Sequence, residues 1–146
     1  MIKSKLLIVT DTVQARILRI HRDSLELLIR IENSELIHVD DAKRKTVSGL
    51  TVTGSVPGGA WERRNTLKDT ARKLFCIQIL NELKAFTNES GDSSISIIAD
   101  PKMLGELRKH LNVDQSSHVI SEFPKDVAGF PLQRLEEFAR SKEIIS

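Results

Sequence analysis

The stretch Ser94–Leu111, SISIIADPKMLGELRKHL, decides the fold of this chain. Its first part, through Ala99, is an isoleucine-rich run of the length of a buried strand. Asp100 is a residue type that caps helices, and Pro101 suits the first helical position. The stretch therefore predicts a buried strand that passes directly into a short amphipathic helix. Four apolar residues would form the inner face of that helix: Met103, Leu104, Leu107 and Leu111.

The segments on either side of this stretch extend the pattern. Residues 5–10, 15–21 and 25–31 predict three strands, and the short polar turns between them favour an antiparallel meander. A long helix is expected over Thr66–Phe86, with Leu67 and Leu74 among its inward residues. A fifth strand is expected at Ser117–Phe123. A last helix begins at Pro131, with inward residues Leu132, Leu135 and Phe138.

The element order is βββαβαβα, which predicts a single α/β domain over residues 1–146 with a mixed five-stranded sheet of order 3-2-1-4-5. Strands joined through a helix run parallel and cross over in the right-handed sense. Helices then cover the faces of the sheet. Residues 32–61 combine Thr/Val alternation with several Gly and one Pro, which is typical of an edge hairpin or a long loop. The Gly and Pro content favours the loop.

The composition is typical of a globular protein, and the net charge does not indicate a particular partner. The chain has 146 residues, 40% of them hydrophobic and 29% charged, with a net charge of +2. A chain of this size buries enough surface to fold without disulfide or metal. Cys76 is the only cysteine and lies in an apolar helical run, so we expect a buried, inert thiol. The apolar run near the N-terminus is too short for a signal peptide, and no run approaches a membrane span. We therefore expect a cytoplasmic protein without membrane insertion.

Several motifs for cofactors and metals are missing from the sequence. The spacing from Gly54 to Gly59 matches a phosphate-binding loop, but Ala60 and Trp61 replace the required Lys and Ser/Thr. His21, His38, His110 and His118 show no metal-ligand spacing and have no cysteine pair beside them. We therefore predict no cofactor.

Three segments carry a resemblance to a known family. They are Asp11–Arg16 (DTVQAR), the glycine-containing Pro57–Gly59 ahead of the long helix, and Ile98–Arg108 (IADPKMLGELR). The chain resembles the family of host-attachment proteins, which are bacterial relatives of the middle domain of archaeo-eukaryotic peptide release factors. The likeness covers nearly the full length, and the Ile98–Arg108 segment is the most specific part of it.

The resemblance implies a binding role near tRNA or the ribosome, without the release-factor chemistry. In release factors a Gly-Gly-Gln triplet assists hydrolysis of peptidyl-tRNA. The corresponding triplet here is Gly58-Gly59-Ala60, and alanine has no side-chain amide. The resemblance thus argues against this hydrolase activity, although the sequence does not settle whether the chain is an enzyme.

The first candidate site is a set of glycines and basic residues around the start of the long helix. Backbone N–H groups at a helix start favour anions, and Lys68 and Arg72 are four residues apart on one helix. These groups predict contacts with RNA phosphates. The competing interpretation is a solvated helix face beside a loop, with Asp69 paired to Lys73. The candidate residues are Gly58, Gly59, Arg63, Arg64, Lys68 and Arg72.

Two alternatives come from other functional classes. Asp11 and Asp100 follow neighbouring predicted strands, where two carboxylates can hold Mg²⁺, and the strand order resembles nucleases of the ribonuclease-H type. The plainer interpretation is that Asp11 makes a turn and Asp100 caps a helix. A third option is a protein-binding or self-associating domain that uses the outer strand 25–31 as an open edge. The sequence leaves the oligomeric state and the identity of the partner open.

Overall fold

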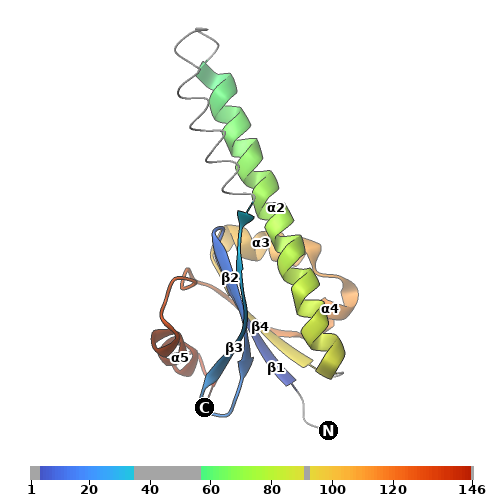
Figure 1. Cartoon of the computed structure of the whole chain (residues 1–146), viewed down its shortest axis with the longest axis vertical. Helices are drawn as coiled ribbons and strands as arrows, with labels where there is room; N and C mark the ends of the chain where they lie inside the picture. The colour runs from blue at the N-terminus through green and yellow to red at the C-terminus, as the bar shows by residue number, and fades with distance from the viewer. Residues whose placement is uncertain (1–3, 35–56, 91–92, 146) are drawn as a thin grey trace.

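The computed structural model describes residues 4–34, 57–90 and 93–145 of the chain. The strands β1 and β2 open the described part, and β3 completes the meander (Figure 1). The remaining elements alternate between helices and strands. In chain order the elements are β1 (Ser4–Thr10), β2 (Gln14–Ile20), β3 (Leu25–Glu32), α2 (Pro57–Ser90), β4 (Ser93–Ala99), α3 (Pro101–His110), α4 (Val113–His118), β5 (Val119–Pro124) and α5 (Leu132–Ser141).

The five strands form one mixed sheet of order β3-β2-β1-β4-β5, which confirms the predicted order. β1 pairs antiparallel with β2, and β2 pairs antiparallel with β3. β1 pairs parallel with β4, and β4 pairs parallel with β5. The short turns of the meander permit only antiparallel neighbours, whereas the helical crossovers allow parallel ones. The chain is therefore a single α/β domain.

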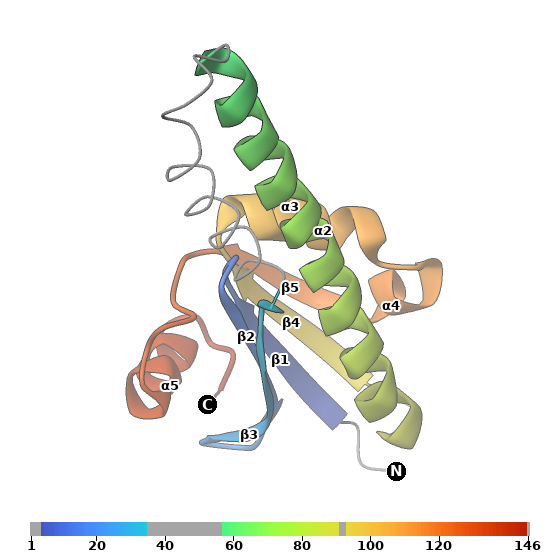
Figure 2. The ribbon, with the colours of Figure 1, turned by 45° about the horizontal axis from the view of Figure 1, so that its top comes forward.

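Both faces of the sheet are covered, on one side by α2 and α3 and on the other by α5 (Figure 2). On β1, Leu6 and Ile8 pack toward α2 and α3, while Leu7 and Val9 pack toward α5. All four side chains are fully buried. Burial of one such side chain stabilises the fold by about 1.5–3 kcal/mol. A strand buried on both faces requires an uninterrupted apolar run, and this explains the sequence LLIV.

Helix α2 begins at Pro57, so the prediction of a loop over residues 32–61 is wrong at its C-terminal end. Gly58 and Gly59 lie in the first helical turn, not in a loop. Proline is well tolerated at a helix start because its missing N–H would have no partner there, and glycine costs most in a helix interior. β3 also extends to Glu32. The remainder of the predicted loop, residues 35–56, lies outside the described residues.

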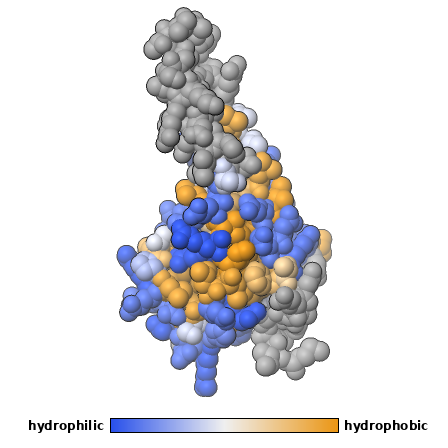
Figure 3. Space-filling model, in the orientation of Figure 1, coloured by the Kyte–Doolittle hydropathy of each residue, from blue (hydrophilic) through white to orange (hydrophobic). Residues whose placement is uncertain are grey.

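Among the side chains that the structure describes on α2, burial begins at Ala71, and the earlier turns of the helix project beyond the sheet (Figure 1). The described residues 66–70 are all exposed. Leu67 and Leu74 were predicted to face inward, but they are 42% and 45% exposed. Apolar surface gathers in the middle of the face seen in Figure 3. The buried face of α2 consists of Ala71, Phe75, Cys76, Ile79, Leu80 and Leu83.

A short helix, α4, precedes β5 and was not predicted. Its first turn is a capping box in which the Asn112 side chain accepts from the backbone N–H of Gln115, and Gln115 accepts from the backbone N–H of Asn112. Gln115 also donates from Nε2 to the carbonyl oxygen of Leu80 on α2 at 3.3 Å. Because α4 takes residues 113–118, β5 begins at Val119 and not at Ser117.

Helix α3 follows the predicted pattern. Pro101 occupies the first turn, and Met103, Leu104 and Leu107 are buried as predicted. Asp100 stands at the N-cap position, as predicted; its side chain makes no capping hydrogen bond of regular geometry, but the N–H of Met103 in the first turn still acts on its carboxyl and offsets part of the rise in pKa that burial causes. On α5, Leu135 is buried, whereas Leu132 is 39% exposed and does not lie in the core as predicted.

Candidate functional site

The first half of α2, residues 57–73, carries a cluster of basic residues, and we call it the basic half. It contains five basic residues and two acidic ones, so its net charge is +3, while the whole chain carries only +2. The second half, residues 74–90, contains one Lys and two Glu and has a net charge of −1. The basic residues are Arg63, Arg64, Lys68, Arg72 and Lys73, and the acidic ones are Glu62 and Asp69.

The structure separates the predicted phosphate-binding residues into three groups. Gly58, Gly59, Arg63 and Arg64 belong to the first turns of α2, where the structure describes the backbone only. Lys68 is exposed on the projecting part of the helix. Arg72 lies one turn further along, and its side chain is only 13% exposed. Lys68 is thus free to meet a large ligand, whereas Arg72 lies where α2 meets the sheet.

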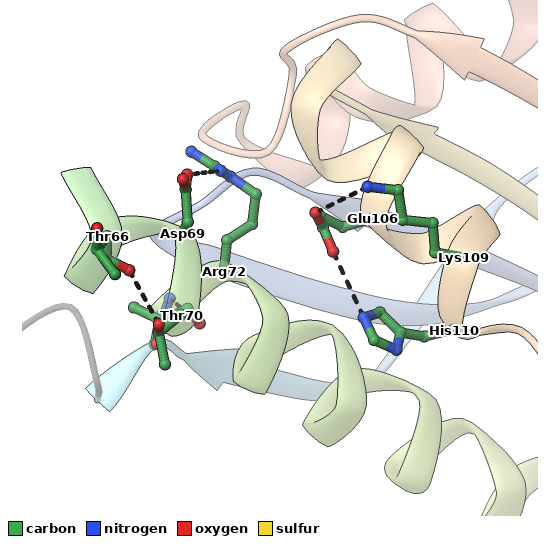
Figure 4. A network of polar contacts seen from close by, with 9 residues as sticks. Thr66, Asp69, Thr70, Arg72, Glu106, Lys109 and His110 are labelled. Carbon is green, nitrogen blue, oxygen red and sulfur yellow. Dashed lines mark hydrogen bonds and ion pairs between the residues drawn. The ribbon is translucent and has the colours of Figure 1, made fainter.

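Arg72 is held by a neighbour on its own helix. Its Nη1 lies 2.8 Å from Oδ1 of Asp69, whose side chain is 70% exposed (Figure 4). The Nε of Arg72 is buried without a hydrogen-bond partner. The predicted pair was Asp69 with Lys73, and the structure instead pairs Asp69 with Arg72. The guanidinium therefore has one end at the surface and the other inside the protein.

Asp11 and Asp100 lie at the same edge of the sheet, as predicted. They directly follow Thr10 and Ala99, which are paired in the parallel register of β1 and β4. Oδ1 of Asp11 accepts the backbone N–H groups of Val13 at 2.7 Å and Gln14 at 2.8 Å. This arrangement is the turn expected for Asp11. It occupies one carboxylate oxygen that a metal ion would otherwise use.

The carboxyl of Asp100 is the more unusual of the two. Its Oδ1 is buried without a hydrogen-bond partner. Burial raises the pKa of Asp100, and the charges of Asp126 and Asp11 raise it further, while the Met103 N–H and Arg72 act in the opposite direction. A carboxyl in this setting favours its neutral form. Among the residues that the structure describes, no group of three or more His, Cys, Asp or Glu side chains could hold a metal ion.

Other titratable groups that the sequence pointed to lie in ion pairs or in the core. Glu106 on α3 lies 3.4 Å from His110 and 3.6 Å from Lys109 (Figure 4). His21 lies 2.8 Å from Glu26. Cys76 is buried, and burial together with the charge of Glu106 raises the pKa of its thiol to about 12, which makes the thiolate form rare at neutral pH. His38 lies outside the described residues.

Two residues that make long-range hydrogen bonds were not predicted from the sequence to do so. Asn33 is buried at the end of β3 and donates from Nδ2 to the carbonyl oxygens of Thr12 at 2.9 Å and Ala71 at 3.4 Å. It therefore joins the Asp11 turn to the point where α2 reaches the sheet. Glu136 on α5 accepts the backbone N–H of Leu25 at 2.8 Å, which ties α5 to β3. Isolated polar residues of this kind give no periodic signal.

The open edge of β3 is protected by charge. Leu27 is 47% exposed, but Glu26, Arg30 and Glu32 are exposed along the same strand. Charged side chains on an edge strand discourage pairing with another chain. A bulge between Ile17 and Leu18 of β2 also interrupts the regular register with β3. These features give the self-association option little support at this edge.

Comparison with known proteins finds a family match, and the similar proteins include a bacterial protein and a solved structure. The model of a family described as "Protein required for attachment to host cells" matches residues 6–138. An uncharacterized protein of Rickettsia prowazekii (strain Madrid E), RP470, is 30% identical over 95 residues, which cover 64% of this chain and 63% of that protein. The crystal structure of the Thermoplasma acidophilum Pelota protein aligns with 98% of this chain and 38% of its own, at 17% identity and a TM-score of 0.43. The matched regions span less than two thirds of the length of either protein.

One further property concerns membranes. Across residues 4–34, 57–90 and 93–145, no helix has the length and apolar character that a bilayer crossing requires.

Proposed function

This chain belongs to the family of proteins required for attachment to host cells, and we propose that its molecular role is that of a non-catalytic module that binds RNA, in tRNA or in the ribosome. The ligand would lie against the basic half of α2. The binding residues would be Gly58, Gly59, Arg63, Arg64, Lys68 and Arg72.

The observation that carries this proposal is the position of the charge. A net +3 lies on a helix half whose described residues 66–70 are all exposed and which projects from the sheet (Figure 1). A helix that projects from the described part of the domain can present its exposed side chains to a large ligand. The partial positive charge of a helix N-terminus adds to the side-chain charge there. An anionic polymer is the ligand class that such a surface favours.

Two features support binding without catalysis. By the resemblance, Ala60 would correspond to the glutamine of the release-factor triplet, and alanine has no side-chain amide. The only cysteine is buried, and its raised pKa makes it a poor nucleophile.

The proposal is tested by titrating tRNA, and separately ribosomes, with the full chain over a range of potassium chloride concentrations. Neutralised phosphates release counterions, so log K should fall linearly with log salt, by about 0.7–0.9 for each phosphate contacted. Three or more contacts therefore predict a slope of about −2 to −3 or steeper. Affinity that does not depend on salt, or no binding to either RNA, would overturn the proposal.

A second candidate, Mg²⁺-dependent cleavage of nucleic acid by Asp11 and Asp100, is favoured by one observation. Asp11 and Asp100 directly follow Thr10 and Ala99, which are partners in the parallel register of β1 and β4, so the two carboxylates lie at the same edge of the sheet. Crystals soaked in Mn²⁺ test this candidate directly. An ion bound to both carboxylates would support it, and density without an ion between them would reject it.

A further inference from the structure

The ion pair between Asp69 and Arg72 lies within the proposed RNA-binding surface and opposes its charge. Asp69 Oδ1 is 2.8 Å from Nη1 of Arg72, and the two side chains face each other along α2 (Figure 4). Asp69 is the only acidic residue of the basic half whose side chain the structure describes. A ligand phosphate that reaches Lys68 would therefore meet an exposed carboxylate on the next residue.

We propose that Asp69 occupies the place of a phosphate in the free protein, and that RNA binding exchanges this carboxylate for a phosphate on Arg72. The inference rests on the proposed function, because it concerns how the same surface is regulated. Arg72 would stay paired with Asp69 until a polyanion displaces that carboxylate. Asp69 is then an autoinhibitory residue that lowers the affinity for RNA.

The exposures of the two side chains make this exchange feasible. Asp69 is 70% exposed, so its carboxylate keeps most of its hydration and contributes little to stability through the pair. Arg72 is 13% exposed and its Nε is buried, so the stem of the side chain stays in place when the partner changes. A guanidinium binds phosphate through two parallel hydrogen bonds, which are stronger than a single contact to a carboxylate.

The test is a double-mutant cycle with tRNA as the probe and the full chain throughout. The variants are Asp69→Ala, Arg72→Met and the double variant, and Asp69→Glu serves as the control that keeps the charge. In the complex, both the parent and Asp69→Ala have a phosphate on Arg72, so their salt slopes should be equal, whereas Arg72→Met should lose one contact and flatten the slope by about 0.7–0.9. Asp69→Ala has no ion pair to break and should bind tRNA about two- to fivefold more tightly than the parent at a fixed salt concentration. In the Arg72→Met background, Asp69→Ala should leave the affinity unchanged.

The possible outcomes distinguish failure of the exchange from failure of the proposed function. If the parent chain binds tRNA but Asp69→Ala binds it with the parental affinity, the exchange is wrong and the proposed function stands. An equal change in both backgrounds would mean that Asp69 repels RNA without acting through Arg72, which also overturns the exchange. If neither the parent nor Asp69→Ala binds, the proposed function and the exchange both fail. Circular dichroism of the four variants confirms that they are folded.

Discussion

Arg16 on β2 donates from Nη2 to the carbonyl oxygen of Phe130 at 2.7 Å, across 114 positions of sequence. The same nitrogen donates to the carbonyl oxygen of Ala128 at 2.9 Å. The connection between β5 and α5 is thereby fixed against the meander. Arg16 ends the segment that begins at Asp11, so both polar ends of DTVQAR have a structural role here, one in a turn and one in a long-range contact.

Replacing Arg16 with Met should destabilise the fold. The aliphatic stem is kept, but two carbonyl oxygens lose a charged donor, and hydrogen bonds to charged groups contribute about 1.5–3 kcal/mol. Urea unfolding should show a decrease in the free energy of unfolding of that size. Arg19→Met on the same strand is the matched control. Equal effects of the two substitutions would mean that the contacts to Ala128 and Phe130 do not stabilise the protein.

Gln115 should be the most sensitive polar residue of α4. It completes the capping box with Asn112 and donates to the carbonyl oxygen of Leu80, and its side chain is 5% exposed. Gln115→Ala leaves buried groups without partners, which costs about 1–3 kcal/mol. Thermal unfolding should show a lower Tm than for Gln133→Ala, which removes the same side chain from an exposed position on α5. A Tm equal to that of the control would contradict the bridging role.

Replacing Glu143 with glycine should stabilise the fold slightly. Its φ is 60°, in the left-handed region. Its N–H donates to Arg140, and the next N–H, of Ile144, donates to Ala139, which is the Schellman pattern at the end of α5. Glycine removes about 1 kcal/mol of backbone strain, and the greater freedom of the unfolded chain offsets part of this gain. Glu143→Gly should therefore raise the free energy of unfolding by a few tenths of a kcal/mol, whereas Glu137→Gly inside α5 should lower it by about 1 kcal/mol.

Asp100 should make stability depend on pH. Burial and neighbouring carboxylates raise its pKa in the folded state, so the folded chain retains the proton to higher pH than the unfolded chain. The neutral Asp100 carboxyl therefore favours the folded state fully below the ordinary Asp pKa of about 3.9. This stabilisation is lost as the pH rises through the raised pKa of the folded state. Asp100→Asn stays neutral. The variant should therefore gain stability relative to the parent as pH rises from about 4 toward neutrality.

Urea unfolding at several pH values measures this difference, with the exposed Asp23→Asn as the control. A difference between Asp100→Asn and the parent that stays constant with pH would contradict the effect of burial on Asp100.

The sequence predicted most of the fold, because burial on two faces produces strong local signals. Apolar runs such as that of β1 identified the strands, and short turns and crossovers then fixed the sheet order. The predicted start of α2 was wrong because Gly58 and Gly59 are typical of loops. In the structure they lie in the first turn of a long helix that begins at a proline. The α4 helix did have a signal, since Asn112 and Gln115 have capping-box spacing.

The candidate site was harder to predict than the fold. In the sequence, Lys68 and Arg72 look alike, because both are basic and they lie one helical turn apart. In the structure, α2 reaches the sheet between them, so Lys68 is exposed and Arg72 is mostly buried. That point depends on Asn33 and Ala71, which are far apart in sequence. Similarly, no local pattern shows that Oδ1 of Asp100 is buried without a hydrogen-bond partner.

The most direct test of the RNA-binding account is a charge reversal on the projecting helix. The triple variant Arg63→Glu, Arg64→Glu and Lys68→Glu should abolish salt-sensitive tRNA binding. The matched triple variant Lys84→Glu, Lys102→Glu and Lys125→Glu changes net charge equally at exposed positions elsewhere and should keep the parental slope. Equal loss of binding in the two triple variants would contradict the account, because overall charge and not the basic half of α2 would then hold the RNA.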